Sequence, residues 1–544
     1  MEEAFFVGVD VGTASARAAV FTSTGECKGF GVNALIIYQD AANSEYSQAT
    51  DQIWEAVCQS VKDALRISGV PLKAIKCIGF DATCSLVCLS EACQPVSVES
   101  QPTTISTYVP NVMMWMDHRA QAQAEALSKL ITSPVLARTG RKISPEMTVA
   151  KLVYLSQRLP DTYSKIGHFM ELPDFLSWRA SGSLKRGVCS VACKWGFDID
   201  IGWDEQFLKD AGLQDMVNDH YCRIGSEFSK PGEALGQGLS EKAAEELGLL
   251  PGISVASAVI DAYAGALATF GYQLSEQDIS TRLAMICGTS SCHVALSKYP
   301  VYVDNVWGPY KDVLFRNMFA GEAGQSATGK VIDFVIDTHM AKGEAEANSR
   351  ALGMNLYEYL EIEAAKESPA LPEMATKDVH VLPDFHGNRS PYADPTMKGI
   401  VAGLTLDSSV KSLALLYVAT IQGLVYQTKH IIDNMNTSGH GIKSIHMSGG
   451  LCKNTLLMQT LSDVTLLPVV LPLNIDETVT LGAAMTAAAS SGLYSLEEAS
   501  KKMNQTSKVM YPSSSLDVRN YHIQKYAVYQ ELCKLQLTIK GIMK

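Results

Sequence analysis

The stretch VGVDVGTASARAAVF, residues 7–21, decides the fold, because it reads as two β-strands joined by an unusual turn. Valines at alternate positions indicate a half-buried strand, and the apolar run of residues 16–21 indicates a second one. Asp10, Gly12 and Thr13 interrupt this pattern, although such residues weaken a strand ladder. We therefore expect an N-terminal hairpin whose turn has a role in binding or catalysis.

A second stretch of the chain repeats the hairpin. MICGTSSCHVAL, residues 285–296, aligns without a gap with VDVGTASARAAV, residues 9–20, so that Gly288 and Thr289 match the glycine and threonine of the first turn. Each copy opens a half of the chain in which predicted strands alternate with predicted helices, which is typical of α/β proteins. The sequence therefore predicts an internal duplication, with an N-terminal domain at residues 1–270 and a C-terminal domain at residues 271–544 that face each other.

Composition excludes several other classes of protein. The chain has 544 residues, 47% hydrophobic and 19% charged, as expected for a soluble globular protein with more than one core. Its net charge of −12 argues against binding to nucleic acids or anionic membranes. The first residues do not resemble a signal peptide, no apolar run is long enough to span a bilayer comfortably, and the 13 cysteines are scattered. We expect a cytoplasmic protein with free thiols.

Further elements follow from periodicity. Helices are predicted at residues 50–68, 144–159, 408–436 and 478–491, and a strand at residues 75–81. The sequence GQSATGKV, residues 324–331, satisfies most of a P-loop pattern, but Val331 stands where the metal-binding Ser or Thr is needed. We interpret this segment as part of a helix that begins at Ala323 without a clear strand before it, and we reject a P-loop.

The two hairpin turns have the chemistry of phosphate-binding loops. A glycine followed by a hydroxyl residue lets backbone N–H groups and a hydroxyl converge on one anion. Two such turns could hold one polyphosphate from both sides; ordinary hairpin turns are the alternative. Asp10 has no counterpart in the second copy, where Ile286 takes its place, so we expect it to bind Mg²⁺ directly or through water. SGGLCKN, residues 448–454, follows a strand and opens a helix, with glycines that would admit a flat base.

Motifs spread from residue 4 to about residue 530 resemble a known family. VGVDVGT, CGTSS, SGGLCKN and LGAAMTAA resemble the phosphate, adenosine and connecting motifs of the actin-like ATPase superfamily. Within it, MWMDHRA, CKW, IDAYAG, GEAGQSATGK and PDFHGNRSP resemble the FGGY carbohydrate kinases, most of all the ribulokinase branch. The resemblance implies two duplicated actin-like (ribonuclease H-like) α/β domains with a ligand cleft between them.

The resemblance also implies an activity, the transfer of a phosphoryl group from ATP to a sugar hydroxyl. Asp261, in VIDAYAG, matches the catalytic base of the family. A carboxylate is ionised at neutral pH and can accept the hydroxyl proton as transfer proceeds. The alternative interpretation of Asp261 from local sequence is a helix N-cap before AYAGALA, and both roles are compatible.

The same resemblance suggests the ligand contacts. We expect the sugar to be bound by side chains that donate or accept hydrogen bonds, although each could instead lie at the surface or at a domain interface: Thr83, Cys84, Asp117, His118, Arg119, Lys194 and Glu322. We expect the nucleotide to contact Gly12, Thr13, Arg17, Gly288, Thr289, Gln325, Gly329, Gly449, Gly450 and Asn454. Lys330 either neutralises phosphate charge or caps a turn that faces the solvent.

The sequence thus predicts a kinase that phosphorylates a small ketopentose, D-ribulose before others, with ATP and Mg²⁺. L-Ribulose, xylulose, ribitol and glycerol are alternative acceptors, since one epimeric hydroxyl is distinguished by the placement of side chains and not by a motif. An actin-like or chaperone-like ATPase and an inactive sugar sensor are alternatives of other classes. A sugar and ATP are the expected partners, with no nucleic acid and no membrane, and a homodimer is left open.

Overall fold

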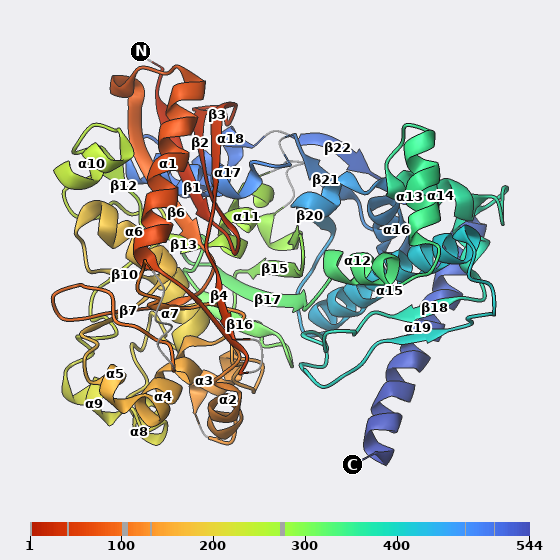
Figure 1. Ribbon diagram of the computed structural model, residues 1–544, viewed down its shortest axis with the longest axis horizontal. Helices are drawn as coiled ribbons and strands as arrows, with labels where there is room; N and C mark the ends of the chain where they lie inside the picture. Colours follow the sequence, from red (N-terminus) through yellow and green to blue (C-terminus); the bar gives the residue numbers. More distant parts are fainter. Residues whose placement is uncertain are drawn as a thin grey trace. The chain divides into compact units, whose positions relative to one another are not determined.

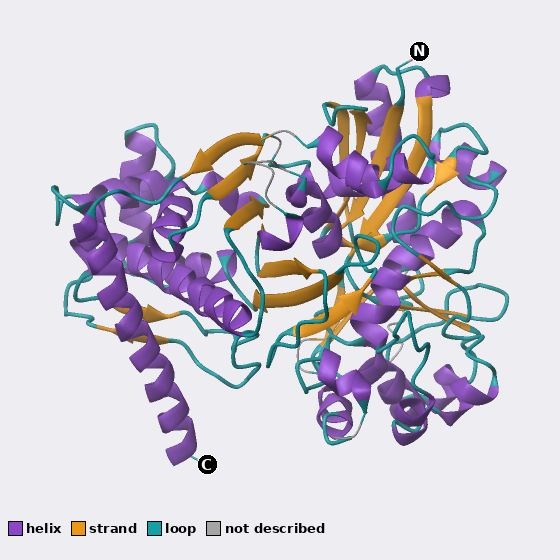
Figure 2. Cartoon of the chain, turned by 180° about the vertical axis from the view of Figure 1, so that it is seen from behind, coloured by secondary structure: helices purple, strands orange, loops and turns teal. Residues whose placement is uncertain are grey.

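The computed structural model describes residues 3–40, 43–100, 107–130, 133–271, 278–473, 475–504 and 506–543. It divides into two compact units (Figure 1). The first unit comprises residues 1–279, 296–321 and 476–505, and the second comprises residues 280–295, 322–475 and 506–544. In both, helices and strands alternate along the chain (Figure 2). The sequence predicted two contiguous domains that meet at residue 270, whereas each unit here is built from several segments of the chain. The domain boundary therefore stays a prediction.

The first unit is built on a sheet in the order β3-β2-β1-β6-β12, with β13 also paired to β6. The predicted hairpin is β1 and β2, which pair antiparallel, and β6 pairs parallel with β1. The strands are β1 (Phe5–Val11), β2 (Ser15–Thr22), β3 (Cys27–Ala34), β6 (Ile75–Ala82), β12 (Ser254–Val255) and β13 (Val259–Ile260). A second sheet of this unit has the order β4 (Tyr38–Asp40), β5 (Glu45–Gln48), β8 (Val112–Met113), β7 (Leu86–Leu89), β9 (His168–Glu171).

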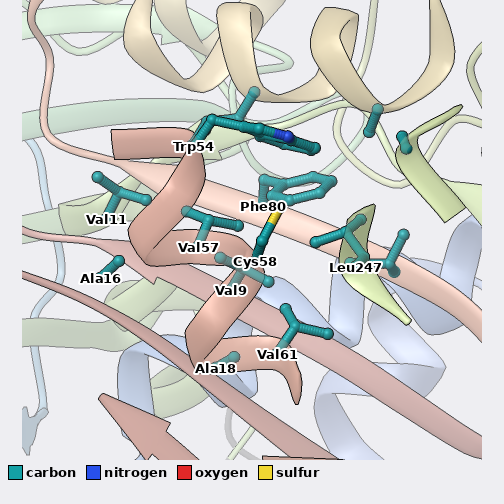
Figure 3. Close-up of a cluster of buried hydrophobic side chains, with 14 of the residues drawn as sticks. Val9, Val11, Ala16, Ala18, Trp54, Val57, Cys58, Val61, Phe80 and Leu247 are labelled. Carbon is teal, nitrogen blue, oxygen red and sulfur yellow. The ribbon is translucent and has the colours of Figure 1, made fainter. Parts of the chain in front are cut away.

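Helices cover both faces of the first sheet. On one face, α1 (Thr50–Ser68) packs Trp54, Val57 and Val61 against alternate residues of β1 and β2 (Figure 3), as the predicted helix at residues 50–68 requires. On the other face lies α17 (Thr478–Ser490), which is rich in alanine and glycine. A methyl group on Gly8 of β1 would overlap the backbone carbonyl of Thr480, so the small residues of strand and helix permit contact between their backbones.

The first unit contains further helices and short strands, and two of the helices carry the candidate residues Lys194 and Asp261. They are α2 (Gln121–Leu127), α3 (Pro134–Arg138), α4 (Thr148–Arg158), α5 (Pro160–Tyr163), α6 (Leu172–Ser181), α7 (Val188–Trp195), α8 (Glu205–Asp210), α9 (Gln214–Asn218), α10 (Glu241–Leu247), α11 (Asp261–Phe270) and α18 (Leu496–Met503), together with the short strands β10 (Arg186–Gly187), β11 (Phe228–Ser229) and β16 (Trp307–Lys311). The predicted helix 144–159 begins later than expected, because Met147 is its N-cap residue.

The second unit repeats the arrangement of the first sheet. Its strands are β17 (Phe319–Gln325), β15 (Ser291–Ser297), β14 (Arg282–Cys287), β20 (Ser444–Ser448), β21 (Val469–Pro472) and β22 (Thr506–Met510), in that order. The hairpin β14–β15 is antiparallel, and β20 pairs parallel with β14 as β6 does with β1. The shared strand order is what the predicted duplication requires. A two-stranded sheet of β18 (His380–Leu382) and β19 (Ile400–Ala402) also belongs to this unit.

Helices of the second unit include the long helix predicted at residues 408–436. They are α12 (Gly329–Asp337), α13 (Lys342–Ala351), α14 (Leu356–Ala365), α15 (Val410–Thr437), α16 (Thr455–Thr465) and α19 (Leu516–Ile542). One predicted element is wrong. The helix expected from Ala323 is strand β17 up to Gln325, and the helix begins only at Gly329. The run FAGEAGQ consists mostly of small residues without a marked period, and its pairing beside β15 makes it a strand. Across the described ranges, the structure has no helix of the length and hydropathy needed to span a membrane.

Candidate functional site

Three aspartates of the first unit gather where parallel strands end. Asp10 and Asp81 are paired positions on β1 and β6, one residue before each strand ends. Asp261 is the first residue of α11 and follows β13 directly, and β13 pairs with the end of β6. Because the carboxyl ends of parallel neighbours meet at the same edge of a sheet, the topology brings these side chains together. The sequence interpretation included Asp10 and Asp261 but missed Asp81.

Burial and mutual repulsion dominate the electrostatics of these acids. Asp10 is 3% exposed and Asp81 is fully buried. Burial raises the pKa of Asp10, while the guanidinium of Arg17, whose Nη1 donates to Asp10 Oδ2 at 3.3 Å, lowers it. Burial raises the pKa of Asp81 well above its usual range, and the negative charges of Asp10 and Asp261 raise it further. No hydrogen-bond donor of the described residues reaches either carboxyl oxygen of Asp81.

A divalent cation fits this end of the sheet. Two orphaned carboxylate oxygens in a buried position are hard ligands that Mg²⁺ prefers, and one or two carboxylates with phosphate oxygens and water usually hold that ion. Within the described ranges, no group of three acidic, histidine or cysteine side chains converges closely enough to hold a metal by itself. The donor set therefore suits a cation that arrives with a phosphate ligand.

Hydrogen bonds within the first unit fix the conformation of the first hairpin turn. Gly12 donates its N–H to Ser15 O at 3.0 Å, and a methyl group on Gly12 would meet only that oxygen, at the ordinary distance of 3.7 Å. The fold itself therefore does not require glycine here. The indole of Trp115 donates to Thr13 Oγ1 at 3.0 Å, and Gln48 donates to Thr13 O at 3.1 Å. These contacts orient the threonine hydroxyl. Trp115 lies in the MWMDHRA motif, but the sequence alone did not suggest this role for it.

Lys194 and Asp261 both lie within electrostatic reach of the Cys84 thiol. Lys194 is the penultimate residue of α7, is 3% exposed, and places its ammonium 4.3 Å from the centre of the Trp307 ring. Desolvation raises the pKa of the Cys84 thiol to about 12, with Lys194 as the largest opposing charge and Glu171 and Asp261 as negative charges that add to the rise. Lys194, Glu171 and Asp261 thus all lie close enough to Cys84 for their charges to act on its thiol.

Glu171 is a buried member of this group that sequence reasoning did not include. Its Oε1 accepts hydrogen bonds from Thr148 and, at 2.8 Å, from the indole of Trp195, while no described donor reaches Oε2. Burial raises its pKa, although Lys151 and Lys194 both oppose this rise. The carboxyl group balances part of the positive charge of the two lysines in the interior.

The MWMDHRA residues have many contacts within the protein. Asp117 and Arg119 form a buried ion pair with 2.6 Å between Oδ2 and Nη2. Asp117 also accepts from the backbone N–H of Tyr46 at 2.8 Å, and Arg119 donates to the backbone carbonyl of Val98 at 2.8 Å. His118 is half-buried between them. This pair therefore stabilises the loop that carries Trp115.

Thr83 has contacts within the first unit as well. Its N–H donates to Val11 O at 3.0 Å, and its hydroxyl lies 3.2 Å from that of Ser85. The backbone contact ties the segment after β6 to the end of β1. Thr83 therefore lies beside the end of the strand that carries Asp10.

In the second unit, the turn between β14 and β15 rests on the start of α12. The amides of Thr328 and Gly329 donate to the carbonyl oxygens of Thr289 and Gly288 at 2.8 and 3.1 Å. A methyl group on Gly329 would come within 2.8 Å of Gly288 O, so this close approach requires glycine. The amide of Gly329 thus supports the turn at Gly288, whose own amide donates to Ser290 O at 2.9 Å. Gly288 itself has no heavy atom within 4 Å of such a methyl group.

Gln325 and Glu322, both on β17, have strong partners in the second unit. The amide of Gln325 donates to Leu424 O at 2.8 Å and to Gln427 Oε1 at 3.0 Å, and the residue is 1% exposed. Glu322, 3% exposed, accepts from Arg389 Nη2 at 2.6 Å. Arg389, in the PDFHGNRSP motif, was not among the predicted site residues, and it fixes one oxygen of a predicted sugar ligand.

The predicted adenosine turn follows β20. Gly449 has a φ of 90°, and a methyl group there would overlap the backbone of Cys287, so glycine brings this turn against the end of β14. Gly450 is exposed, with open space around it. Asn454 is the N-cap of α16, accepting from Leu457 N at 2.8 Å, and its Nδ2 donates to Tyr417 at 2.7 Å. Asn454 thus shapes the turn from behind.

Comparison with known proteins identifies the family. The N-terminal and C-terminal domain models of the FGGY family of carbohydrate kinases match residues 5–268 and 283–491. The chain belongs to the FGGY family of carbohydrate kinases. It is therefore a sugar kinase, and the kinases of this family use ATP, generally with a divalent metal.

Relatives of this FGGY kinase span nearly all of it. An FGGY carbohydrate kinase domain-containing protein of Xenopus laevis is 41% identical over 553 residues, covering 100% of this chain and 98% of the relative. The protein of the same name from Homo sapiens is 41% identical and covers 99% and 98%. A D-ribulokinase of Saccharomyces cerevisiae is 37% identical and covers 90% of this chain and 72% of its own length.

Solved structures confirm the predicted fold class of this FGGY kinase. A xylulose kinase from Lactobacillus acidophilus gives a TM-score of 0.80 at 16% identity and covers 99% of this chain and 100% of its own. A xylulose kinase from Rhodospirillum rubrum gives 0.78 at 18% and covers 98% and 99%. At these identities the likeness shows the fold alone, which is the predicted two-domain, actin-like α/β fold.

Proposed function

We propose that this FGGY kinase transfers the γ-phosphoryl group of ATP to D-ribulose, giving D-ribulose 5-phosphate, with Mg²⁺ as the divalent cation. The observation that carries the proposal is in the first unit, where the buried ammonium group of Lys194 and the carboxylate of Asp261 both act on the Cys84 thiol. The name D-ribulokinase of the yeast relative supports the choice of sugar.

The chemistry assigned to Asp261 is that of a general base. Its carboxylate would accept the proton of the attacking hydroxyl as the new bond to phosphorus forms and the bond to the leaving ADP oxygen breaks. One Asp261 oxygen already accepts from the N–H of Ala262 at 2.7 Å, which fixes the orientation of the group. Lys194 would donate a hydrogen bond to a sugar oxygen and so help to orient the acceptor.

The remaining predicted contacts divide between phosphate and sugar. We assign the phosphates to the turns at Gly12–Thr13 and Gly288–Thr289, with Arg17 beside the first turn and Mg²⁺ held by Asp10. The cation would neutralise phosphate charge during transfer. Glu322, one oxygen of which is bound by Arg389, keeps its other oxygen to accept from a sugar hydroxyl. The adenosine is assigned to the turn at Gly449–Gly450.

The domain roles follow from these assignments. Residues 1–270 would supply the base, the first phosphate turn and most of the sugar contacts. Residues 271–544 would supply the second phosphate turn and the adenosine turn. Gln325, Gly329 and Asn454 remain assigned to the nucleotide, and hydrogen bonds within the protein hold all three in place.

The test is ADP release from Mg·ATP by the purified protein with D-ribulose, L-ribulose, D-xylulose, ribitol, glycerol or no sugar. We expect D-ribulose to give the largest kcat/KM and the blank to give little ADP. A larger value with another sugar would replace D-ribulose by that sugar. ADP release at the same rate in every arm would contradict the sugar-kinase assignment and favour an actin-like ATPase.

A further inference from the structure

Asp81 has a place in the fold that puts its carboxyl group beside that of Asp10. Residues paired directly across two parallel strands point to the same face of the sheet, and neighbouring strands lie about 4.8 Å apart. Asp10 and Asp81 are such a pair on β1 and β6.

Among the described residues, none donates a hydrogen bond to Asp81, and the guanidinium whose positive charge acts on it, that of Arg17, is already bound to Asp10. Both carboxyl oxygens are buried and receive no hydrogen bond from the described residues. Other buried acids of the same unit do receive donors: Asp117 accepts from the N–H of Tyr46, and Asp174 accepts from the N–H of Gly187 at 2.7 Å. A buried carboxylate that receives no hydrogen bond costs several kcal/mol, so such a group points to a missing positive ligand.

The second hairpin shows that the fold does not need this acid pair. The equivalent paired positions on β14 and β20 are Ile286 and Ser448, in the same parallel register. The same backbone arrangement therefore forms with an apolar and a hydroxyl side chain. The sheet arrangement therefore does not account for the presence of the two acids.

We propose that Asp81, together with Asp10, binds the divalent cation that accompanies the nucleotide. The inference rests on the proposed role of Asp10 and adds a second protein ligand to it. Two carboxylates and the phosphate oxygens would then share one ion, in keeping with the usual Mg²⁺ ligand set. With two anchors on adjacent rigid strands, the position of the cation is fixed more tightly than by one side chain.

The experiment measures Mn²⁺ binding to the full-length protein with saturating ADP and no sugar, by electron paramagnetic resonance of free Mn²⁺. Asp81→Asn keeps the shape of the side chain and removes its charge. We expect its dissociation constant for Mn²⁺ to rise at least tenfold. Asp174→Asn, which removes an equally buried charge elsewhere in the unit, should bind Mn²⁺ as the unmodified protein does. Equal Mn²⁺ affinity of Asp81→Asn and the unmodified protein would overturn the inference.

A second variant keeps the test decisive if Asp81→Asn folds poorly. Asp81→Cys puts a small, soft ligand at the same position, and thiolate ligands favour Cd²⁺ over hard cations. We expect the ratio of Cd²⁺ to Mn²⁺ affinity to rise at least tenfold relative to the unmodified protein, with no change in Asp174→Cys. An unchanged ratio in Asp81→Cys would refute a ligand role.

Because no sugar is present, the metal measurement is independent of the acceptor. Loss of Mn²⁺ affinity in Asp81→Asn alongside ADP release that no sugar stimulates would overturn the proposed function and uphold this inference. Normal Mn²⁺ affinity in Asp81→Asn, together with phosphorylation of D-ribulose, would overturn this inference and uphold the proposed function.

Discussion

Replacing Gly288 by alanine should separate nucleotide binding from stability. The glycine lies in the exposed turn between β14 and β15, and a methyl group at its Cα has no heavy atom within 4 Å. Its φ lies outside the left-handed region, so alanine can adopt the same backbone conformation. If the space around Gly288 is kept for a phosphate group, the methyl group removes that space without disturbing the fold.

The expected magnitudes have opposite signs. A glycine-to-alanine change at a compatible position stabilises a protein by about 0.4–1 kcal/mol, because the unfolded chain loses freedom. A hydrogen bond to a charged group contributes about 1.5–3 kcal/mol. The methyl group introduced by Gly288→Ala would displace the phosphate from the turn, and we expect one such bond to be lost. ATP affinity should therefore fall by roughly 10-fold to 150-fold, while the free energy of unfolding is unchanged or rises.

The assay is a calorimetric titration with ATP, paired with denaturant unfolding of the same samples. Gly441→Ala is the matched control, since its methyl group also has no neighbour within 4 Å and its φ is likewise outside the left-handed region. That variant should bind ATP normally. ATP affinity of Gly288→Ala equal to that of the control, or a clear loss of stability, would refute the reasoning.

Three further changes test other parts of the site. Asp261→Asn should keep ATP affinity and lose about 10²–10⁴-fold in kcat, measured by ADP release with D-ribulose, because the base is gone. Arg389→Lys loses the guanidinium contact that fixes Glu322, so KM for the sugar should rise about tenfold at unchanged ATP affinity, measured by steady-state kinetics. Burial raises the pKa of Asp174 to about 7, so the native state binds more protons than the unfolded state between about pH 4 and 7 and stability falls as pH rises through that window. Asp174→Asn should lose this fall, which urea unfolding at pH 5 and pH 8 would measure.

Each of these predictions has a contrary result. Unchanged turnover in Asp261→Asn would remove the base from this position. A fall in kcat with constant sugar KM in Arg389→Lys would place the arginine in the chemical step and not in the positioning of Glu322. A pH dependence of Asp174→Asn that matches the unmodified protein would show that another group causes the loss of stability.

The strand pattern and the small motifs allowed much of the fold to be predicted. Alternating valines located β1, the helical period located α1 to the residue, and the repeated Gly-Thr turn revealed the duplication. The segment at Ala323 was misjudged because small residues have no clear period, and only pairing with a neighbouring strand made it β17. Long-range pairing of this kind leaves no local signal.

The candidate site was predictable in its motifs and less so in its contacts. Asp81 ends the predicted strand at residues 75–81, but its importance depends on its pairing with Asp10, which a single strand does not reveal. Arg389 is 67 residues from Glu322 in sequence, so only the folded chain shows that they touch. The predicted contact of Gly329 with phosphate stays a prediction, and the hydrogen bond from its amide to Gly288 O is visible only in the folded chain. Sequence motifs indicate which residues have reactive or polar groups, and only the folded structure shows which partners those groups have.

The unequal hairpins have a consequence for how such sequences change over generations. Two buried carboxylates side by side lower the free energy of unfolding of the first unit, whereas the second sheet has Ile286 and Ser448 at the equivalent positions. An uncharged replacement of similar volume would remove that cost, so such replacements of either acid would be tolerated once catalysis ceased to be selected. In a descendant that only senses sugar, the positions of Asp10 and Asp81 should therefore acquire uncharged residues, as the second hairpin already has. The survival of both acids in this chain is what continued selection for turnover would leave behind.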